Sequence, residues 1–184
     1  MPTFSANLGF LFGDQSLPNA IRSAHRAGFA AVECHWPYEE DSAAIRAALE
    51  ETGLPLLGLN TARGNVGGGE MGLSAVPGRQ EEARQAIDQA FDLAQELNAE
   101  AVHVMAGRAQ GPEAEAVFVE NLLYACDHAA QSRRIVLIEP LNRYSAPGYF
   151  FDTTAQAERL IEQVGRVELR LMFDCFHVQM TEAI

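Results

Sequence analysis

Short apolar runs alternate with amphipathic helical segments along almost the whole chain, with few residues between them. The pattern predicts strands at residues 4–12, 30–36, 54–60, 101–106, 134–139 and 167–173. It predicts helices at residues 17–27, 42–51, 78–97, 113–130 and 154–164, and a sixth helix that begins at Met180. The run at residues 135–138 is apolar on both faces, which is typical of a parallel sheet. Strict alternation predicts right-handed crossovers and an α/β fold.

Two architectures fit this alternation, an open doubly wound sheet and a (β/α)₈ barrel. The first strand–helix turn carries neither the glycine-rich dinucleotide fingerprint nor a Walker loop. Several predicted strands end in or carry polar groups that a barrel could gather at one mouth. These residues are Asn7, Glu33, Asn60, His103, Glu139 and Asp174. We therefore predict one domain, residues 1–184, that is a TIM barrel with only about six strand–helix units present in this chain.

Composition limits the classes of protein that fit. The chain has 184 residues, of which 48% are apolar, as expected for one soluble globular domain. Its formal net charge of −12 argues against a nucleic-acid partner and against an anionic membrane. No apolar stretch approaches the roughly 18 residues of a membrane span, and the N-terminus lacks a secretory signal. Cys34, Cys126 and Cys175 form no C-x-x-C pair, which favours a reducing cytoplasm.

Glu139 is the first candidate for chemistry, because a carboxylate that ends a buried strand is costly unless something compensates its charge. Asp174 ends the next buried strand in the same way, so both carboxylates are expected at one mouth. Carboxylate oxygens suit Mg²⁺ or Mn²⁺, and such an ion would let two like charges share a site. The alternative is two separate carboxylates, each paired with an arginine or capping a helix.

Three further polar residues and one loop have two interpretations each. His177 follows Asp174 at D-x-x-H and shares its site only if the chain turns after Asp174; otherwise it is a loop histidine. His103 either projects into the barrel or is a hydrogen-bonded core residue. Asn142 is either a turn former or an amide that holds the Glu139 carboxylate. The glycine-rich segment 63–77 is either a functional loop or a disordered connection.

Eight stretches of the chain form a recognisable set. They are residues 4–8, 28–33, 36–38, 69–73, 76–79, 102–107, 138–142 and 173–177. Together they resemble the hydroxypyruvate isomerase family of the xylose-isomerase-like TIM barrels, and the similarity runs the whole length of the chain. The glycine-loop stretches and E-P-L-N at 139–142 are specific to this branch, whereas D-x-x-H is shared by the wider superfamily.

The resemblance implies an aldose–ketose type isomerase. Such enzymes interconvert hydroxypyruvate and 2-hydroxy-3-oxopropanoate (tartronate semialdehyde) by metal-assisted proton transfer through an enediolate. By this resemblance Glu139 is both a metal ligand and the acid/base, and Asp174 is a metal ligand. His177 is expected to face the substrate, with His103 and Asn142 also binding it. The implied cofactor is Mg²⁺ or Mn²⁺, and the implied partner is a small hydroxy-oxo acid.

The chain departs from the family pattern in two respects. The family completes its metal shell from a seventh strand and takes a second acid/base glutamate from an eighth. This sequence ends before either, so we expect a form truncated at its C-terminus, whose free strand edges would favour association, including a homo-oligomer. The second departure is Ser145, which stands where related ketose 3-epimerases carry a glutamate and therefore disfavours an epimerase.

Three functions remain open on the sequence alone. The leading one is the metal-assisted isomerase of a small hydroxy-oxo acid. A 2-oxo-tetronate isomerase, which acts on a four-carbon sugar acid, would use the same site with a slightly different pocket. An inactive or regulatory barrel fragment is the third, supported by the missing strands. Endonuclease relatives in the superfamily use a basic DNA-facing surface, which a net charge of −12 disfavours.

Overall fold

The computed structural model describes residues 2–182, which contain six parallel strands in chain order. They are β1 (Ser5–Asn7), β2 (Ala31–Glu33), β3 (Gly58–Asn60), β4 (Ala101–His103), β5 (Ile135–Ile138) and β6 (Leu169–Leu171). β1 pairs with β2, and β3 to β6 form a second sheet. Val32 joins the two, because its N–H donates to Pro55 O (3.0 Å) and its carbonyl accepts from Leu57 N (2.8 Å). The predicted α/β barrel architecture is therefore confirmed in its first six units.

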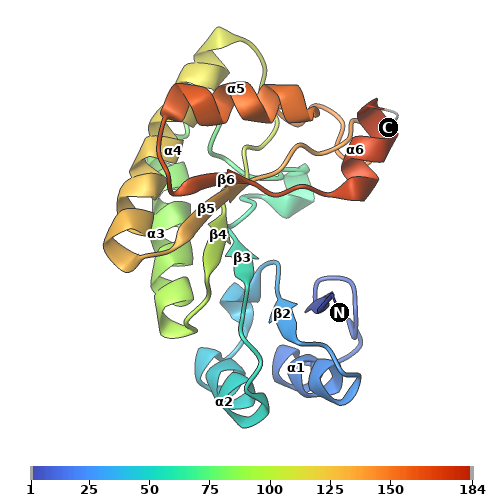
Figure 1. Cartoon of the computed structure of the whole chain (residues 1–184). Helices are drawn as coiled ribbons and strands as arrows, with labels where there is room; N and C mark the ends of the chain where they lie inside the picture. The colour runs from blue at the N-terminus through green and yellow to red at the C-terminus, as the bar shows by residue number, and fades with distance from the viewer. Residues whose placement is uncertain (1, 183–184) are drawn as a thin grey trace.

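Helices follow the strands in turn, and Figure 1 shows α1 to α5 around the outside of the strands, with α6 beyond the end of β6. They are α1 (Leu17–Arg26), α2 (Ser42–Thr52), α3 (Gln80–Glu96), α4 (Pro112–Ser132), α5 (Thr154–Val164) and α6 (Cys175–Glu182), with the short 3₁₀ helices η1 (Pro37–Glu39) and η2 (Val66–Gly68). Local capping interactions determine where several of these helices begin and end. Thr153 and Gln156 form a capping box at α5, and Gly165 ends that helix in the left-handed conformation. Among residues 2–182, no helix is long and apolar enough to span a membrane.

The core lies between the strands and the inner faces of the helices. Val32, Leu59, Val102 and Val136 of the strands are at most 1% exposed. Ile21, Ile45, Ile87 and Leu122 of the helices are buried to the same degree. Burial of each such side chain contributes about 1.5–3 kcal/mol. This packing holds the strands rigidly, so side chains at the strand ends have fixed positions.

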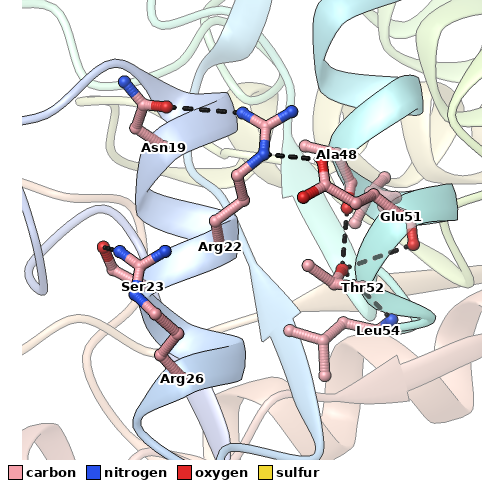
Figure 2. Close-up of polar contacts among 9 residues, drawn as sticks. Asn19, Arg22, Ser23, Arg26, Ala48, Glu51, Thr52 and Leu54 are labelled. Carbon is pink, nitrogen blue, oxygen red and sulfur yellow. Dashed lines mark hydrogen bonds and ion pairs between the residues drawn. The ribbon is translucent and has the colours of Figure 1, made fainter.

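A polar contact links the middle of α1 to the C-terminal turn of α2, as Figure 2 shows. Arg22 Nε of α1 donates to Glu51 Oε2 of α2 at 2.7 Å, and Arg22 Nη1 donates to Asn19 Oδ1 at 3.3 Å. Thr52 Oγ1 donates to the Ala48 carbonyl at 2.7 Å near the C-terminal end of α2. Glu51 is exposed, so this ion pair contributes less than about 1 kcal/mol.

Two predicted element bounds differ most from the structure. The first strand ends at Asn7 rather than residue 12, because the Asn7 side chain accepts from Gly9 N (2.9 Å) and its carbonyl accepts from Leu11 N (2.9 Å). These bonds turn the chain, as asparagine often does after a strand. The last helix begins at Cys175 rather than Met180. The residues of the D-x-x-H motif are therefore at a helix start, not on an extended strand.

The glycine-rich segment 63–77 is folded, so the alternative of a disordered connection is wrong. Glu70 accepts from Asn65 N (2.6 Å) and from Arg79 Nη1 (2.7 Å), which closes the tip of the loop. Gly72 bridges Ala106 in antiparallel fashion. Asn121 of α4 donates to the Ser74 carbonyl at 2.8 Å, which ties the C-terminal half of the loop to the helices.

Replacement of Gly72 is expected to destabilise the fold strongly. Gly72 has φ +115°, and a Cβ atom there would lie 2.4 Å from the Met105 carbonyl oxygen. We expect Gly72→Ala to lower the free energy of unfolding by about 2–4 kcal/mol in urea denaturation. Gly67→Ala in the same loop is the matched control, since the nearest atom to its Cβ would be 3.6 Å away. A loss at Gly72 no larger than at Gly67 would contradict the packing described here.

Candidate active site and metal centre

One cavity of about 580 Å³ opens at the carboxyl ends of the strands. All six polar strand-end residues singled out in the sequence line it, namely Asn7, Glu33, Asn60, His103, Glu139 and Asp174. Strand register explains this, because Asn7 is the Cα partner of Glu33 and Asn60 is the partner of His103. The parallel sheet thus places these side chains at one level. A second cavity of about 590 Å³ near the start of α4 has no histidine in its lining.

Glu139, Asp174 and His177 form a compact group of potential ligands. Each offers one ligand atom, and these atoms lie within 4.8 Å of one another. Glu139 directly follows β5 and Asp174 lies three residues beyond β6, and these two strands pair with each other. Two carboxylates at this separation supply the oxygen donors that Mg²⁺ or Mn²⁺ prefers. The residues present therefore fit a divalent cation.

The start of α6 determines how Asp174 and His177 share the site. Asp174 Oδ1 accepts from Phe176 N at 2.7 Å, and the Asp174 carbonyl accepts from Val178 N at 3.0 Å. Asp174 thus caps the helix with one carboxylate oxygen and leaves Oδ2 free. The helical turn brings His177 Nε2 to 3.9 Å from that oxygen. This is the turn after Asp174 that a shared site required.

Asn142 holds His177 rather than Glu139. Its backbone N–H donates to His177 Nδ1 at 3.0 Å, and its side-chain nitrogen lies 2.8 Å from the same atom. Asn142 Oδ1 accepts from Tyr144 N (3.1 Å) and Ser145 N (3.0 Å), which fixes the amide orientation. The interpretation as a turn former is therefore right, whereas the amide makes no hydrogen bond to the Glu139 carboxylate. Asn142 is fully buried and does not line the cavity.

These bonds determine the tautomer of His177. An amide N–H can only donate, so Nδ1 must accept, and the neutral ring then carries its proton on Nε2. Burial lowers the pKa of His177, although the charge of Asp174 opposes this shift. The neutral ring therefore presents an N–H donor, not a lone pair, towards Asp174. Of the three clustered residues, Glu139 and Asp174 are therefore the better metal ligands.

Asn142→Asp is expected to change the protonation of His177. The aspartate keeps the oxygen that accepts from Tyr144 and Ser145 but places a negative charge beside Nδ1. A carboxylate there stabilises the imidazolium, so we expect the pKa of His177 to rise. Long-range ¹H–¹⁵N NMR spectra check both points. The unaltered protein should show the Nε2–H tautomer, and an Nδ1–H tautomer would contradict the assignment. Asn19→Asp on α1 is the control, and it should leave the pKa of His177 unchanged.

Burial and like charges raise the pKa values of the carboxyls in the cavity. Burial raises the pKa of Glu139 to about 8, and the charges of Asp174 and Glu33 act in the same direction. Burial also raises the pKa of Glu33, a shift that a hydrogen bond from Asn7 opposes. Glu139 has only 12% of its side chain exposed, and none of the arginines within residues 2–182 lines the cavity. A divalent cation would relieve this concentration of negative charge.

His103 is buried but not satisfied by hydrogen bonds. Its Nδ1 lies 3.9 Å from Glu139 Oε2, which is too long for a hydrogen bond. Burial lowers its pKa to about 3, so the ring is neutral and the close approach is not an ion pair. Nε2 has no hydrogen-bond partner within residues 2–182. Such an atom in a cavity wall points to a polar ligand.

His35 is a cavity residue that the sequence did not single out. Its ring contacts Phe10 and Trp36 edge-on, with centroid distances of 4.9 Å in both cases. A Cβ atom on Gly9 would lie 2.2 Å from its Nδ1, so the ring occupies the space that glycine leaves. The period of a strand could have revealed it, because His35 lies two residues after Glu33 and so faces the same side.

Comparisons with known proteins agree with this geometry. A family model described as "Xylose isomerase-like TIM barrel" matches residues 21–183. The protein of Homo sapiens named "Putative hydroxypyruvate isomerase" is 45% identical over 97% of this chain and 68% of its own length. A 2-oxo-tetronate isomerase of Cupriavidus necator is 37% identical over 99% of this chain and 72% of its own length. The solved structure of an AP endonuclease, family 2, from Brucella melitensis has a TM-score of 0.94 at 34% identity, covering 99% of this chain and 72% of that one.

Proposed function

The chain belongs to the xylose isomerase-like TIM barrel family, and from this premise we propose that it is an isomerase that interconverts hydroxypyruvate and 2-hydroxy-3-oxopropanoate. The observation that carries the proposal is the group formed by Glu139, Asp174 and His177, whose ligand atoms lie within 4.8 Å of one another. The similarity to a relative named for hydroxypyruvate supports the choice of substrate.

We propose that Glu139 and Asp174 hold Mg²⁺ or Mn²⁺. Their oxygens are the ligands that these ions prefer, and a cation would oppose the burial and the neighbouring negative charges that raise the pKa of Glu139. When bound, such an ion would polarise the substrate carbonyl and stabilise the negative charge of the enediolate.

The reaction moves hydrogen between neighbouring carbons and consumes no oxidant or reductant. In the forward direction a C3–H bond of hydroxypyruvate breaks and a C2–H bond forms. The C3 hydroxyl loses its proton, and the C2 oxygen gains one. We propose that Glu139 takes the proton from C3 and returns it to C2, since a positioned carboxylate can act as a general base and then as a general acid.

The two histidines are proposed to bind the substrate oxygens. His177 would donate its Nε2–H to a substrate oxygen, because Asn142 already occupies Nδ1. His103, neutral and with an unpartnered Nε2, would form a second hydrogen bond in the buried wall. Asn142 would act on the substrate through His177 rather than by contact, since it does not line the cavity.

A substrate panel tests the proposal. Purified protein with Mg²⁺ or Mn²⁺ would be mixed with hydroxypyruvate or with the four-carbon 2-oxo-tetronate, and product formation followed by NMR. We expect a higher kcat/KM with hydroxypyruvate. A preference for the four-carbon acid would favour the second candidate, a 2-oxo-tetronate isomerase, which the 37% identical relative supports. Metal binding without turnover of either compound would favour the inactive or regulatory alternative.

We also propose a cell compartment and a class of partner for this protein. A net charge of −12 supports a small-molecule substrate rather than nucleic acid or an anionic membrane. The cysteines are unpaired, with Cys34 and Cys126 buried and Cys175 exposed beside Asp174. An exposed thiol next to a metal ligand is best preserved in a reducing cytoplasm, which we propose as the location.

A further inference from the structure

The proposed substrate carries a negative charge into a cavity that is already acidic. Glu33, Glu139 and Asp174 line the cavity, whereas no arginine in the described part of the chain does. A single divalent cation would leave little positive charge for the substrate's own carboxylate. Recognition of an acid therefore calls for a cationic side chain at the cavity rim. The chain contains no lysine, so the permanently cationic candidates are its 13 arginines.

Arg63 contacts one residue of the cavity wall. Its guanidinium carbon is 3.7 Å from the ring centroid of Trp36, and Trp36 lines the cavity. The Trp36 ring is itself fixed, because its Nε1 donates to the Thr61 carbonyl at 3.2 Å. The Arg63 main chain is fixed as well, since its carbonyl accepts from Gly72 N at 3.0 Å. Both ends of the Arg63 residue are thus held in place.

The charge of Arg63 is available to a ligand. Within residues 2–182 no carboxylate forms an ion pair with it, whereas Arg79, nearby in the sequence, is engaged by Glu70 and Glu82. Stacking on an aromatic face leaves the N–H donors in the guanidinium plane free. Its field also reaches the cavity, since Arg63 adds to burial in lowering the pKa of His35.

We propose that Arg63, held on the face of Trp36, binds the carboxylate of the substrate and so selects hydroxy-oxo acids over neutral sugars. This inference rests on the proposed function, because it identifies the acid-recognising group of the same site. A planar guanidinium matches a carboxylate through two parallel hydrogen bonds. The metal would then be left to the carbonyl and hydroxyl end of the substrate, at Glu139 and Asp174.

The sole tryptophan of the chain provides a direct readout, because Trp36 lies under the Arg63 side chain. D-glycerate is the probe, since it carries the carboxylate and hydroxyls but no carbonyl and cannot react. With Mg²⁺ present, we expect D-glycerate to change Trp36 fluorescence saturably and glycerol to have no effect at the same concentrations. Arg63→Gln should weaken D-glycerate binding by about 10–100-fold, and Arg63→Lys by less.

Arg84→Gln is the matched control, because Arg84 also lies over an aromatic ring, Tyr124 at 5.2 Å, but on α3 away from the cavity. It should bind D-glycerate like the unaltered protein. Unchanged affinity in a folded Arg63→Gln protein would overturn the inference, as would a lack of D-glycerate binding by the unaltered protein. Binding that depends on Arg63 without isomerisation of hydroxypyruvate would instead reject the proposed function and leave the carboxylate site standing.

Discussion

Glu139→Gln should abolish most of the isomerase activity while leaving the fold intact. Gln cannot accept the carbon-bound proton, so we expect kcat for hydroxypyruvate to fall by roughly 10³-fold. The substitution also removes a charged metal ligand, so affinity for Mn²⁺ should fall in calorimetric titration. The fold should not suffer, because the carboxyl is 12% exposed and has a pKa of about 8, and a neutral amide avoids the cost of ionisation above that pH.

Glu100→Gln is the control for this experiment. Glu100 is exposed and directly precedes β4, so it lies at the end of the barrel opposite the cavity. Its substitution should leave kcat, metal affinity and thermal stability unchanged. If Glu139→Gln kept more than about a third of the activity, Glu139 could not be the proton-transfer group. If it unfolded the protein, the account of its buried side chain would be wrong.

The barrel architecture could be predicted because the pattern of apolar residues that produces it is periodic. Strands buried on both faces and helices with one apolar stripe are visible in the sequence, and their alternation leaves few topologies. The predicted strand and helix bounds were most in error where a single side chain ends or starts the element. Asn7 ends β1 by accepting from Gly9, and Asp174 starts α6 by accepting from Phe176. Such local hydrogen bonds compete with the strand pattern, and periodicity alone does not reveal them.

The site could be predicted only to the level of which strand ends meet. Strand-end position placed Glu139 and Asp174 correctly, because parallel strands carry their carboxyl ends to one mouth. The contact between Asn142 and His177 joins residues 35 apart and depends on how two loops pack. The stacking of Arg63 on Trp36 depends on the folded glycine loop in the same way. Contacts of this kind depend on tertiary packing, so no residue spacing in the sequence indicates them.

Affinity for the divalent ion should depend steeply on pH. The pKa of Glu139 in the metal-free protein is about 8, so its carboxyl is protonated at pH 6 and the ion must displace that proton. We expect the Kd for Mg²⁺ to fall about tenfold per pH unit from pH 6 to pH 8 and then to level off. Calorimetry in two buffers of different ionisation enthalpy should show close to one proton released per ion bound at pH 7.

The raised pKa of Glu139 also determines whether the metal-free protein gains or loses stability as pH rises. The folded pKa of about 8 lies above the value of 4.5 for an ordinary glutamate, so between these limits the folded state binds the extra proton. Glu139 therefore favours the metal-free fold at low pH, and this contribution declines as pH rises through that window, by up to about 1.4 kcal/mol per pH unit. Tm of the metal-free protein should fall from pH 5 to pH 8, and Mg²⁺ should restore it. Glu139→Gln should remove most of this slope. A slope unchanged by that substitution, or metal affinity that is flat across pH 6–8, would mean that Glu139 is already ionised and that the cavity compensates its charge by other means.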